Sequence, residues 1–189
     1  QKEYSQAVDD YKQIIKLDPS RFDILLEIGD LYIKQNNMIK GNLYYNQYLN
    51  EFPDDFEIYI KLGESYSKLH EYDEAVNQYK KAVIMKSDNY SILLNLGELY
   101  SNLGKFEQAF YNYNEYFHNT SDKFNYYRNI INYFIRKGQH NNAINASDSA
   151  FANSNISSSS RAVTHGFGIY QYSCYIEIGQ QDLALKNRV

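Results

Sequence analysis

The side chains that could perform acid–base, nucleophilic or metal chemistry are few, and their spacing matches no catalytic motif. The four histidines are His70, His118, His140 and His165, and none lies at the three- or four-residue spacing that places two metal ligands on one helix face. The single cysteine, Cys174, excludes an intramolecular disulfide and a cysteine-based metal cluster. We therefore expect no catalytic residues, no cofactor and no metal site within this sequence, and we predict that it is not an enzyme.

Three carboxylates recur at a fixed interval, and they are the side chains best placed to bind a partner through charge. Asp30, Glu64 and Glu98 follow one another at steps of 34 residues. Lys34 and Lys68 follow the first two acids by four residues, a spacing at which opposite charges on one helix pair for about 0.2–0.5 kcal/mol. The pattern leaves two interpretations, because the acids can bind basic groups of a partner or pair within solvated helices.

The acids belong to a longer pattern that repeats every 34 residues. Gly29, Gly63 and Gly97 recur at this interval. The tyrosine and alanine positions that share it are Tyr32, Tyr66 and Tyr100; Tyr11, Tyr45, Tyr79 and Tyr113; and Ala75, Ala109 and Ala143. Self-similarity at such a period indicates a solenoid of stacked units rather than a single globular core.

Each repeat has the pattern of two helices. Between residues 92 and 103, apolar side chains follow a three-to-four spacing that lines one helix face, and Gly104 ends this stretch. A second apolar stripe runs from residue 106 to residue 117. Gly97 lies inside the first helix, where Gly costs about 1 kcal/mol relative to Ala. We predict that Gly97 allows a close approach of the second helix, with Ala109 serving the same purpose from the other side.

These residues resemble the tetratricopeptide repeat. Two successive units carry the ordered family pattern, as Leu62, Gly63, Tyr66, Tyr72, Ala75, Tyr79 and Ala82, and then as Leu96, Gly97, Tyr100, Gly104, Phe106, Ala109 and Tyr113. Pro19 and Pro53 match the proline that closes the family pattern. The resemblance covers residues 3–155 and implies an all-α fold, a right-handed superhelical solenoid of antiparallel helix pairs.

We predict a single array over residues 1–189, and we interpret it as a piece of a longer protein because it begins without Met and inside a repeat. The predicted divisions are a partial unit 1–21, the units 22–55, 56–89, 90–123 and 124–157, and an irregular unit 158–189.

Two units depart from the family pattern. In the first full unit Gly41 replaces the usual Ala, which predicts a locally weaker second helix. In the fourth unit Ile131 replaces the Gly and Ser147 replaces the second-helix Tyr. We therefore expect the close contact between the two helices of that unit to open.

Charge and composition limit the classes of partner. The net charge is −4, which argues against a nucleic-acid partner, and we assign most of the 21 tyrosines to packing rather than to base stacking. Residues 1–123 carry 13 basic and 20 acidic residues, whereas residues 124–189 carry 6 and 3. No apolar run approaches membrane-spanning length, so we expect no membrane insertion and a soluble protein, with a cytoplasmic location favoured.

In tetratricopeptide-repeat proteins the first helices of the repeats line a concave groove. Carried over by position, the resemblance implies a groove formed by Leu26, Asp30, Ile60, Glu64, Leu94, Asn95, Glu98, Arg128, Asn129 and Asn132. An aliphatic row would lie beside an acidic row, with a change of character in the fourth unit. Such a surface favours an apolar, basic peptide and would repel the acidic chaperone tails that some family members bind.

The resemblance implies a non-catalytic scaffold that binds a protein or peptide partner in this groove, as part of a larger assembly. The alternative is a regulatory or substrate-recruiting arm of a multidomain enzyme such as a glycosyltransferase. A third interpretation is self-association through the ends of the array, because both termini leave an apolar helix face uncovered.

Overall fold

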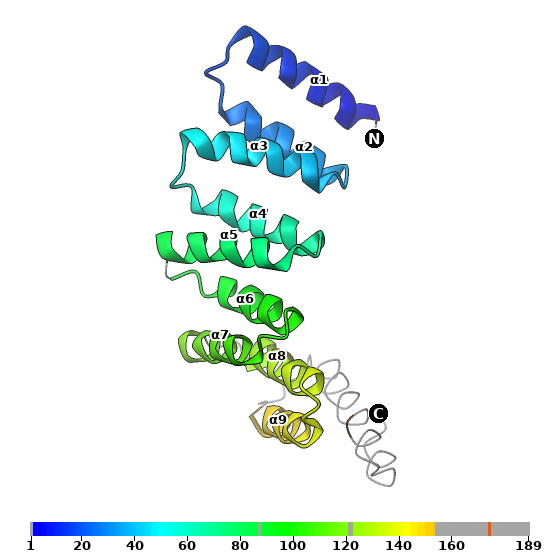
Figure 1. The fold of residues 1–189 in the computed structure, drawn as a ribbon, viewed down its shortest axis with the longest axis vertical. Coiled ribbons are helices and arrows are strands. Elements are labelled where there is room, and N and C mark those ends of the chain that lie inside the picture. The colour runs from blue at the N-terminus through cyan, green and yellow to red at the C-terminus, as the bar shows by residue number, and fades with distance from the viewer. Residues whose placement is uncertain (1, 87, 121–122, 154–173, 175–189) are drawn as a thin grey trace. The chain divides into compact units, whose positions relative to one another are not determined.

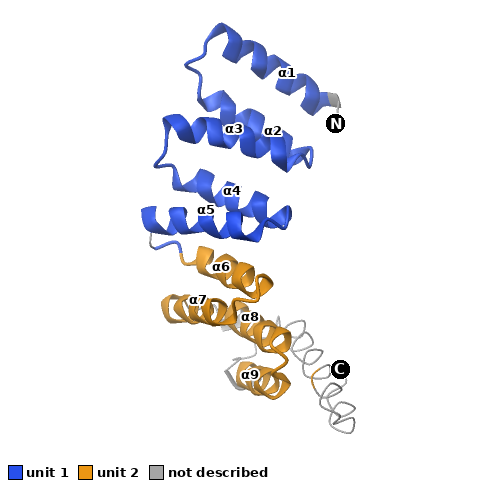
Figure 2. Ribbon diagram, viewed as in Figure 1, with its two compact units in different colours: residues 1–89 blue, residues 90–189 orange. Residues whose placement is uncertain are grey.

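The structure is a computed structural model that describes residues 2–86, 88–120 and 123–153 together with Cys174 (Figure 1). The ordered elements in these ranges are α-helices, which confirms the predicted all-α fold class. The chain divides into two units, residues 1–89 and residues 90–189 (Figure 2). None of the helices in the described ranges is long and apolar enough to cross a membrane.

The first unit consists of a leading helix and two helical hairpins. Its helices are α1 (Lys2–Leu17), α2 (Asp23–Lys34), α3 (Met38–Glu51), α4 (Phe56–Lys68) and α5 (Tyr72–Met85) (Figure 1). Helix α2 packs on α3 and α4 packs on α5, while α1 contacts α2 and α3 contacts α4. The core between α1 and α2 is formed by Val8, Ile24, Ile28 and Tyr32. Helices α1 to α5 therefore pack in chain order, each on its neighbours within this unit.

The second unit contains two further hairpins. Its helices are α6 (Ser91–Asn102), α7 (Phe106–Asn119), α8 (Lys123–Arg136) and α9 (His140–Asn153) (Figure 1). Helix α8 contacts α6 and α7, which precede it in the chain, and α9, which follows it. The predicted unit 158–189 lies outside the described residues, apart from Cys174. That cysteine is 1% exposed and packs with Ile131, Ala143, Ile144 and Ala150.

The turns inside the hairpins share one backbone geometry. Asn36, His70, Gly104 and Gly138 have φ values of 60°, 61°, 70° and 71°, and they occupy the same position of successive repeats. This left-handed conformation ends a helix and is easiest for Gly and tolerated by Asn. His70 therefore has a structural role at the turn, as its place in the repeat predicts, and its Nδ1 lies 2.7 Å from the Tyr72 hydroxyl.

The recurrent glycines of the first helices lie directly against tyrosine rings. A Cβ added to Gly29 would lie 2.6 Å from Cε1 of Tyr45, and one added to Gly63 would lie 2.9 Å from Cε1 of Tyr79. At Gly97 the Cβ would overlap the ring of Tyr113. Atoms cannot approach so closely, so these positions exclude any side chain. The close helix contact predicted from Gly97 is confirmed.

Gly41 compensates for a bulky neighbour in its own hairpin. A Cβ on Gly41 would lie 2.6 Å from Cδ1 of Ile33 and 3.1 Å from the carbonyl oxygen of Gly29. The next two repeats place Ser67 and Ser101 where the first has Ile33, and both have Ala where the first has Gly41. Helix α3 continues without a break through Gly41. The absent methyl group therefore makes room for Ile33.

Replacement of Gly41 by Ala is expected to bring no gain in stability. Ala favours a helix over Gly by about 1 kcal/mol, but its Cβ would collide with Ile33 and with the Gly29 carbonyl. The double variant Ile33→Ser/Gly41→Ala should be more stable than Ile33→Ser alone by about the propensity difference. Urea unfolding of the parent and the three variants, followed by circular dichroism, measures these differences. A Gly41→Ala variant more stable than the parent would show that Ile33 moves aside at no cost.

The fourth repeat exchanges the large and small residues of the helix contact. Ile131 on α8 and Ser147 on α9 occupy the positions of Gly97 and Tyr113 in the preceding repeat. Both are 0% exposed, and Ile131 packs in one cluster with Ala143 and Ile144. The sequence predicts an opening between these helices; both residues are nevertheless buried, so the space between α8 and α9 is closed to solvent at these positions.

Candidate functional site

In the first unit, Asp30 is bound by two side chains and is not a free carboxylate. The Tyr45 hydroxyl on α3 donates a hydrogen bond to Asp30 Oδ1, and Lys61 Nζ on α4 lies 2.8 Å and 3.0 Å from the two carboxylate oxygens. The ammonium group of Lys61 also lies 5.5 Å from the centroid of the Tyr45 ring. The partner of Asp30 is therefore in the next repeat, instead of the four-residue neighbour Lys34 that the sequence suggests.

The phenol of Tyr45 remains protonated and acts as a donor in this network. Tyr45 is only 2% exposed, and this burial raises the pKa of its hydroxyl far above the usual range. The hydrogen bond to Asp30 and the charges of Asp30 and Glu64 raise the pKa further. The protonated phenol holds the carboxylate from within the hairpin and Lys61 holds it from the next repeat, so the main role of Asp30 in this structure is to join α2, α3 and α4.

The other predicted groove residues of the first unit remain accessible. Leu26 on α2 and Ile60 on α4 are half-buried, and Glu64 on α4 is exposed. A small recess of about 160 Å³ lies between α2, α3 and α4. It is lined by Asp30, Ile33, Met38, Tyr45, Lys61, Glu64, Ser65 and Lys68. Its two acids and two lysines balance in charge. Glu64 is exposed, whereas Asp30 is half-buried and paired with Lys61.

In the second unit, acidic and basic side chains surround Tyr113. Glu98 on α6 is exposed, whereas Tyr113 on α7 is 2% exposed. Burial, and then the charge of Glu98, raise the pKa of Tyr113 far above its usual range, while the charges of Arg136 and Arg128 oppose this rise. Arg136 also donates hydrogen bonds from α8 to Ser101 and Asn102 on α6. The change from an acidic to a mixed surface thus occurs between α6 and α8.

The remaining predicted groove residues of the second unit differ in exposure. Leu94 and Asn95 on α6 and Asn132 on α8 are half-buried, and Arg128 is exposed. Asn129 is only 8% exposed, and its side-chain amide donates a 2.9 Å hydrogen bond to the carbonyl of Asn125 in its own helix. Asn129 therefore contributes little surface to a partner site.

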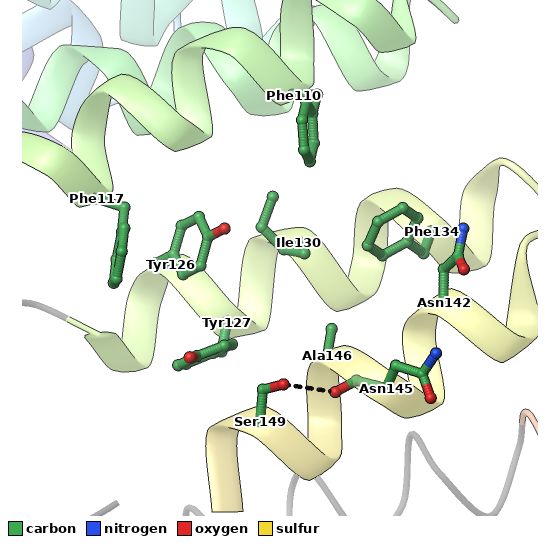
Figure 3. Close-up of a pocket in the computed structure, with 10 residues that line it drawn as sticks. All are labelled: Phe110, Phe117, Tyr126, Tyr127, Ile130, Phe134, Asn142, Asn145, Ala146 and Ser149. Carbon is green, nitrogen blue, oxygen red and sulfur yellow. Dashed lines mark hydrogen bonds between the residues drawn. The ribbon is translucent and has the colours of Figure 1, made fainter. Parts of the chain in front are cut away.

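The second unit also has a concave feature that the sequence analysis does not predict. A hollow of about 500 Å³ lies between α7, α8 and α9, hereafter the α7–α9 hollow (Figure 3). It is lined by Phe110, Phe117, Tyr126, Tyr127, Ile130, Phe134, Asn142, Asn145, Ala146 and Ser149. Figure 3 shows Phe110 and Phe117 pointing from α7 into this space.

Two aromatic clusters build the wall of the α7–α9 hollow. The rings of Phe117 and Tyr126 stack with their centroids 4.2 Å apart, and the Tyr126 hydroxyl donates a 3.1 Å hydrogen bond to Asn114. At the other end, the Phe110 ring lies 5.5 Å from Tyr133 and 6.4 Å from Phe134. The opposite wall, on α9, consists of short and mostly polar side chains. Ser149 there donates a 2.8 Å hydrogen bond to the backbone carbonyl of Asn145 (Figure 3).

The sequence contains one sign of this hollow, which is that α9 has short side chains where the equivalent positions of α5 have long ones. The aromatic residues by themselves predict only packing. Positions 142, 146 and 149 of α9 hold Asn, Ala and Ser. The equivalent residues of α5 are Glu74, Gln78 and Lys81, which are longer. Among the described residues, no group of three or more His, Cys, Asp or Glu side chains is placed to hold a metal ion.

Comparison with known proteins supports the repeat assignment. The family model of the TPR repeat matches residues 68–104, which include the end of α4 and all of α5 and α6. No sequence among the curated proteins matches the chain.

Solved structures show the same architecture at low sequence identity. A crystal structure of MamA is 19% identical over 88% of this chain and 87% of that chain, with a TM-score of 0.72. A tetratricopeptide repeat protein from Parabacteroides merdae ATCC 43184 is 14% identical over 97% and 70%, with a TM-score of 0.80. BtubC from P. vanneervenii is 19% identical over 98% and 85%, with a TM-score of 0.71. Residues 68–104 thus match the TPR repeat, and the chain has the all-α helical-repeat solenoid fold of these tetratricopeptide-repeat structures.

Proposed function

We propose that this chain is a non-catalytic scaffold that binds a protein or peptide partner on the exposed faces of the first helices of its repeats. The observation that carries the proposal is the pairing of an exposed acid with a half-buried aliphatic residue on each of two first helices. Ile60 and Glu64 form the pair on α4, and Leu94 and Glu98 form it on α6. Each pair is four residues apart, so the two side chains lie on one helix face.

The aliphatic residues supply the area that a partner can cover. Leu26, Ile60 and Leu94 are half-buried, so a partner side chain that covers their exposed part removes apolar surface from water. Burial of such surface is worth about 25 cal/mol per Å² before the entropic cost of binding is subtracted. A partner segment is therefore expected to carry apolar side chains that cover these residues.

The exposed acids supply selectivity for a basic partner. Glu64 and Glu98 are the exposed carboxylates of the predicted groove, whereas Asp30 is already neutralised by Lys61. Complementary charge at the rim of an interface mainly sets the association rate and the choice of partner. Lys or Arg side chains of a partner would thus be placed beside Glu64 and Glu98, and Asp30 would keep its structural role.

Charge reversal at the two exposed acids tests this function. The whole chain and its Glu64→Lys/Glu98→Lys variant are used to select binders from one phage library of short random peptides. The parent is expected to enrich peptides that combine aliphatic residues with Lys or Arg. The variant should bind those peptides about tenfold more weakly, with a smaller salt dependence, because attraction becomes repulsion.

The control is Glu51→Lys/Glu115→Lys, which makes the same change in net charge on the second helices α3 and α7. It should bind the selected peptides like the parent. Circular dichroism checks that all three proteins are folded. Equal binding by both double variants, or enrichment of acidic peptides by the parent, would contradict the proposed surface.

A further inference from the structure

Helix α1 carries an apolar stripe that the described part of the chain leaves partly open. It consists of Tyr4, Ala7, Tyr11 and Ile14, whose spacing places them on one face of the helix, and it is called the α1 stripe below. Tyr4 is 40% exposed and Ile14 is 37% exposed, while Ala7 and Tyr11 are half-buried. Contiguous exposed apolar surface marks an interaction site, whereas single exposed apolar residues are common on any surface.

Later repeats of the same molecule show what covers such a stripe. The positions of Ala7, Tyr11 and Ile14 are taken on α5 by Ala75, Tyr79 and Ala82, and on α7 by Ala109, Tyr113 and Tyr116. These equivalents are at most 6% exposed, because α4 packs on α5 and α6 packs on α7 as the first helix of the same hairpin. Helix α1 instead packs on α2, which belongs to the next hairpin. The occupant that suits the α1 stripe is therefore a helix with the features of α2, α4 and α6.

The covering helix must have Gly opposite Tyr11. In the first hairpin, a Cβ on Gly29 would lie 2.6 Å from the ring of Tyr45, the equivalent of Tyr11. At the position equivalent to Ala7, a Cβ on Gly41 would lie 3.1 Å from the carbonyl oxygen of Gly29, so the two helices also approach closely there. A helix that fits the α1 stripe thus carries Gly at this point and an apolar residue directly before it, as α2, α4 and α6 do.

Helix α2 sets the charge that the covering helix should carry after this Gly. In the next repeat, Lys61 on α4 forms an ion pair with Asp30 on α2, which directly follows Gly29. The position of Lys61 is taken in α2 by Glu27, which is exposed. By the same geometry, Glu27 would lie beside the residue that follows the Gly of the covering helix. Lys or Arg there would be attracted and an acid repelled, while the Tyr11 hydroxyl can accept a hydrogen bond as well as donate one.

This charge separates a partner protein from a second copy of the chain. In α2, α4 and α6 the residue after the Gly is acidic, as Asp30, Glu64 and Glu98. Each of these helices would therefore place a carboxylate beside Glu27 of the other copy. Helix α8 has Ile131 in place of the Gly and would collide with Tyr11. Among the described helices, none has both the shape and the charge that the α1 stripe requires.

Lys34 adds a preference near the end of the covering helix. Arg136 on α8 donates a hydrogen bond to Asn102 on α6, which holds the equivalent position one repeat earlier and lies five residues after Gly97. Lys34 occupies this position in α2 and is exposed. An amide or carboxylate at the fifth residue after the Gly of the covering helix would accept a hydrogen bond from Lys34 in the same way.

We propose that the α1 stripe binds a helix of a partner protein in which an apolar residue, Gly and then Lys or Arg follow one another, with an amide or carboxylate five residues after the Gly. The bound helix extends an existing core, since Tyr11 already packs at the edge of the cluster that contains Val8 and Ile28. The site goes beyond the scaffold function proposed above, because it uses α1 instead of the exposed faces of α4 and α6.

The test uses three fluorescent peptides based on α6, SILLNLGELYSN, each lengthened by the same helical segments because short isolated helices are marginally stable. The first keeps the α6 sequence, the second (the Lys peptide) carries Glu98→Lys, and the third carries Glu98→Lys with Gly97→Leu. Fluorescence anisotropy measures their binding to the whole chain. The Lys peptide should bind about fivefold more tightly than the α6 peptide, the size of effect that exposed charges produce. The third peptide should bind at least about tenfold more weakly than the Lys peptide, because Leu collides with Tyr11.

Variants of the protein locate the site. Glu27→Lys should reverse the preference, so that the α6 peptide binds about fivefold more tightly than the Lys peptide. Ala7→Arg should weaken binding of the Lys peptide at least about tenfold, because its side chain holds the two helices apart. The matched control Gln13→Arg makes the same change in charge on the other side of α1, two residues from Tyr11, and should bind like the parent. Circular dichroism checks that every variant is folded.

Glu64→Lys/Glu98→Lys should leave the affinity for the Lys peptide unchanged, which separates this site from the first-helix surface. The proposal is overturned by equal binding of the Lys and α6 peptides to the parent, or by an Ala7→Arg variant that binds like Gln13→Arg. A concentration-dependent dimer of the parent that Ala7→Arg abolishes would assign the stripe to a second copy instead. A form of the protein extended before Gln1 that fails to bind the Lys peptide would assign the stripe to its own chain.

Discussion

Gly97→Leu is expected to destabilise the protein by about 3 kcal/mol or more, the upper end of the usual cost of overpacking. A Cβ alone at this position overlaps the Tyr113 ring, and Leu adds three further carbons. Tyr113 cannot move away easily, because it is 2% exposed and is enclosed between α6 and α7. The two helices must therefore separate or the ring must leave its rotamer. Urea unfolding followed by circular dichroism measures the loss.

Gly104→Ala is the matched control for this variant. No atom lies within 4 Å of a Cβ placed on Gly104, so the new methyl group meets no neighbour. The backbone there has a φ of 70°, however, and a left-handed conformation costs a residue with a Cβ about 1–2 kcal/mol. Gly104→Ala in the turn should thus lose less stability than Gly97→Leu at the helix contact. Equal losses for the two variants would contradict the close-contact explanation. Truncation of Tyr113 to Ala should recover part of the stability only in the Gly97→Leu background.

The second large effect is expected at the exchanged pair of the fourth repeat. Ile131→Ala should cost about 2–5 kcal/mol, because the fully buried side chain leaves a cavity that its neighbours cannot fill completely. Ser147→Tyr should also be strongly destabilising, since Ser147 is 0% exposed and a ring has no space beside Ile131.

The combined variant Ile131→Gly/Ser147→Tyr distinguishes an exchange of volume from two unrelated core positions. It restores the arrangement of Gly97 and Tyr113, so it should be more stable than Ser147→Tyr alone, with a favourable coupling energy of about 1–3 kcal/mol. Unfolding of the parent, the Ile131→Gly and Ser147→Tyr single variants and the double variant gives this energy. Additive losses would show that the two positions do not share one space.

The sequence by itself determined the repeat, the helical hairpins and the close approach of the second helix at Gly97, whereas the structure shows that the Tyr113 ring is what Gly97 faces. These features depend on short-range relations, since the contacting residues Gly97 and Tyr113 are 16 positions apart within one hairpin. A residue as unfavourable in a helix as Gly needs a local reason to recur, and close packing is the most direct one. Periodicity therefore fixed which face of each helix is buried, and the helical-repeat architecture followed from it.

The tertiary structure alone decided which charges pair and where the surface is hollow. The sequence suggests Lys34 as the partner of Asp30, and only the packing of α4 on the first hairpin brings Lys61 to it instead. Asn129 has the spacing of an exposed residue, but the contacts of α8 bury it. The short side chains of α9 have consequences only because α7 and α8 supply an aromatic wall opposite them. Pairing and concavity depend on the distances between helices that are far apart in the chain, and a repeat pattern records the order of residues but not those distances.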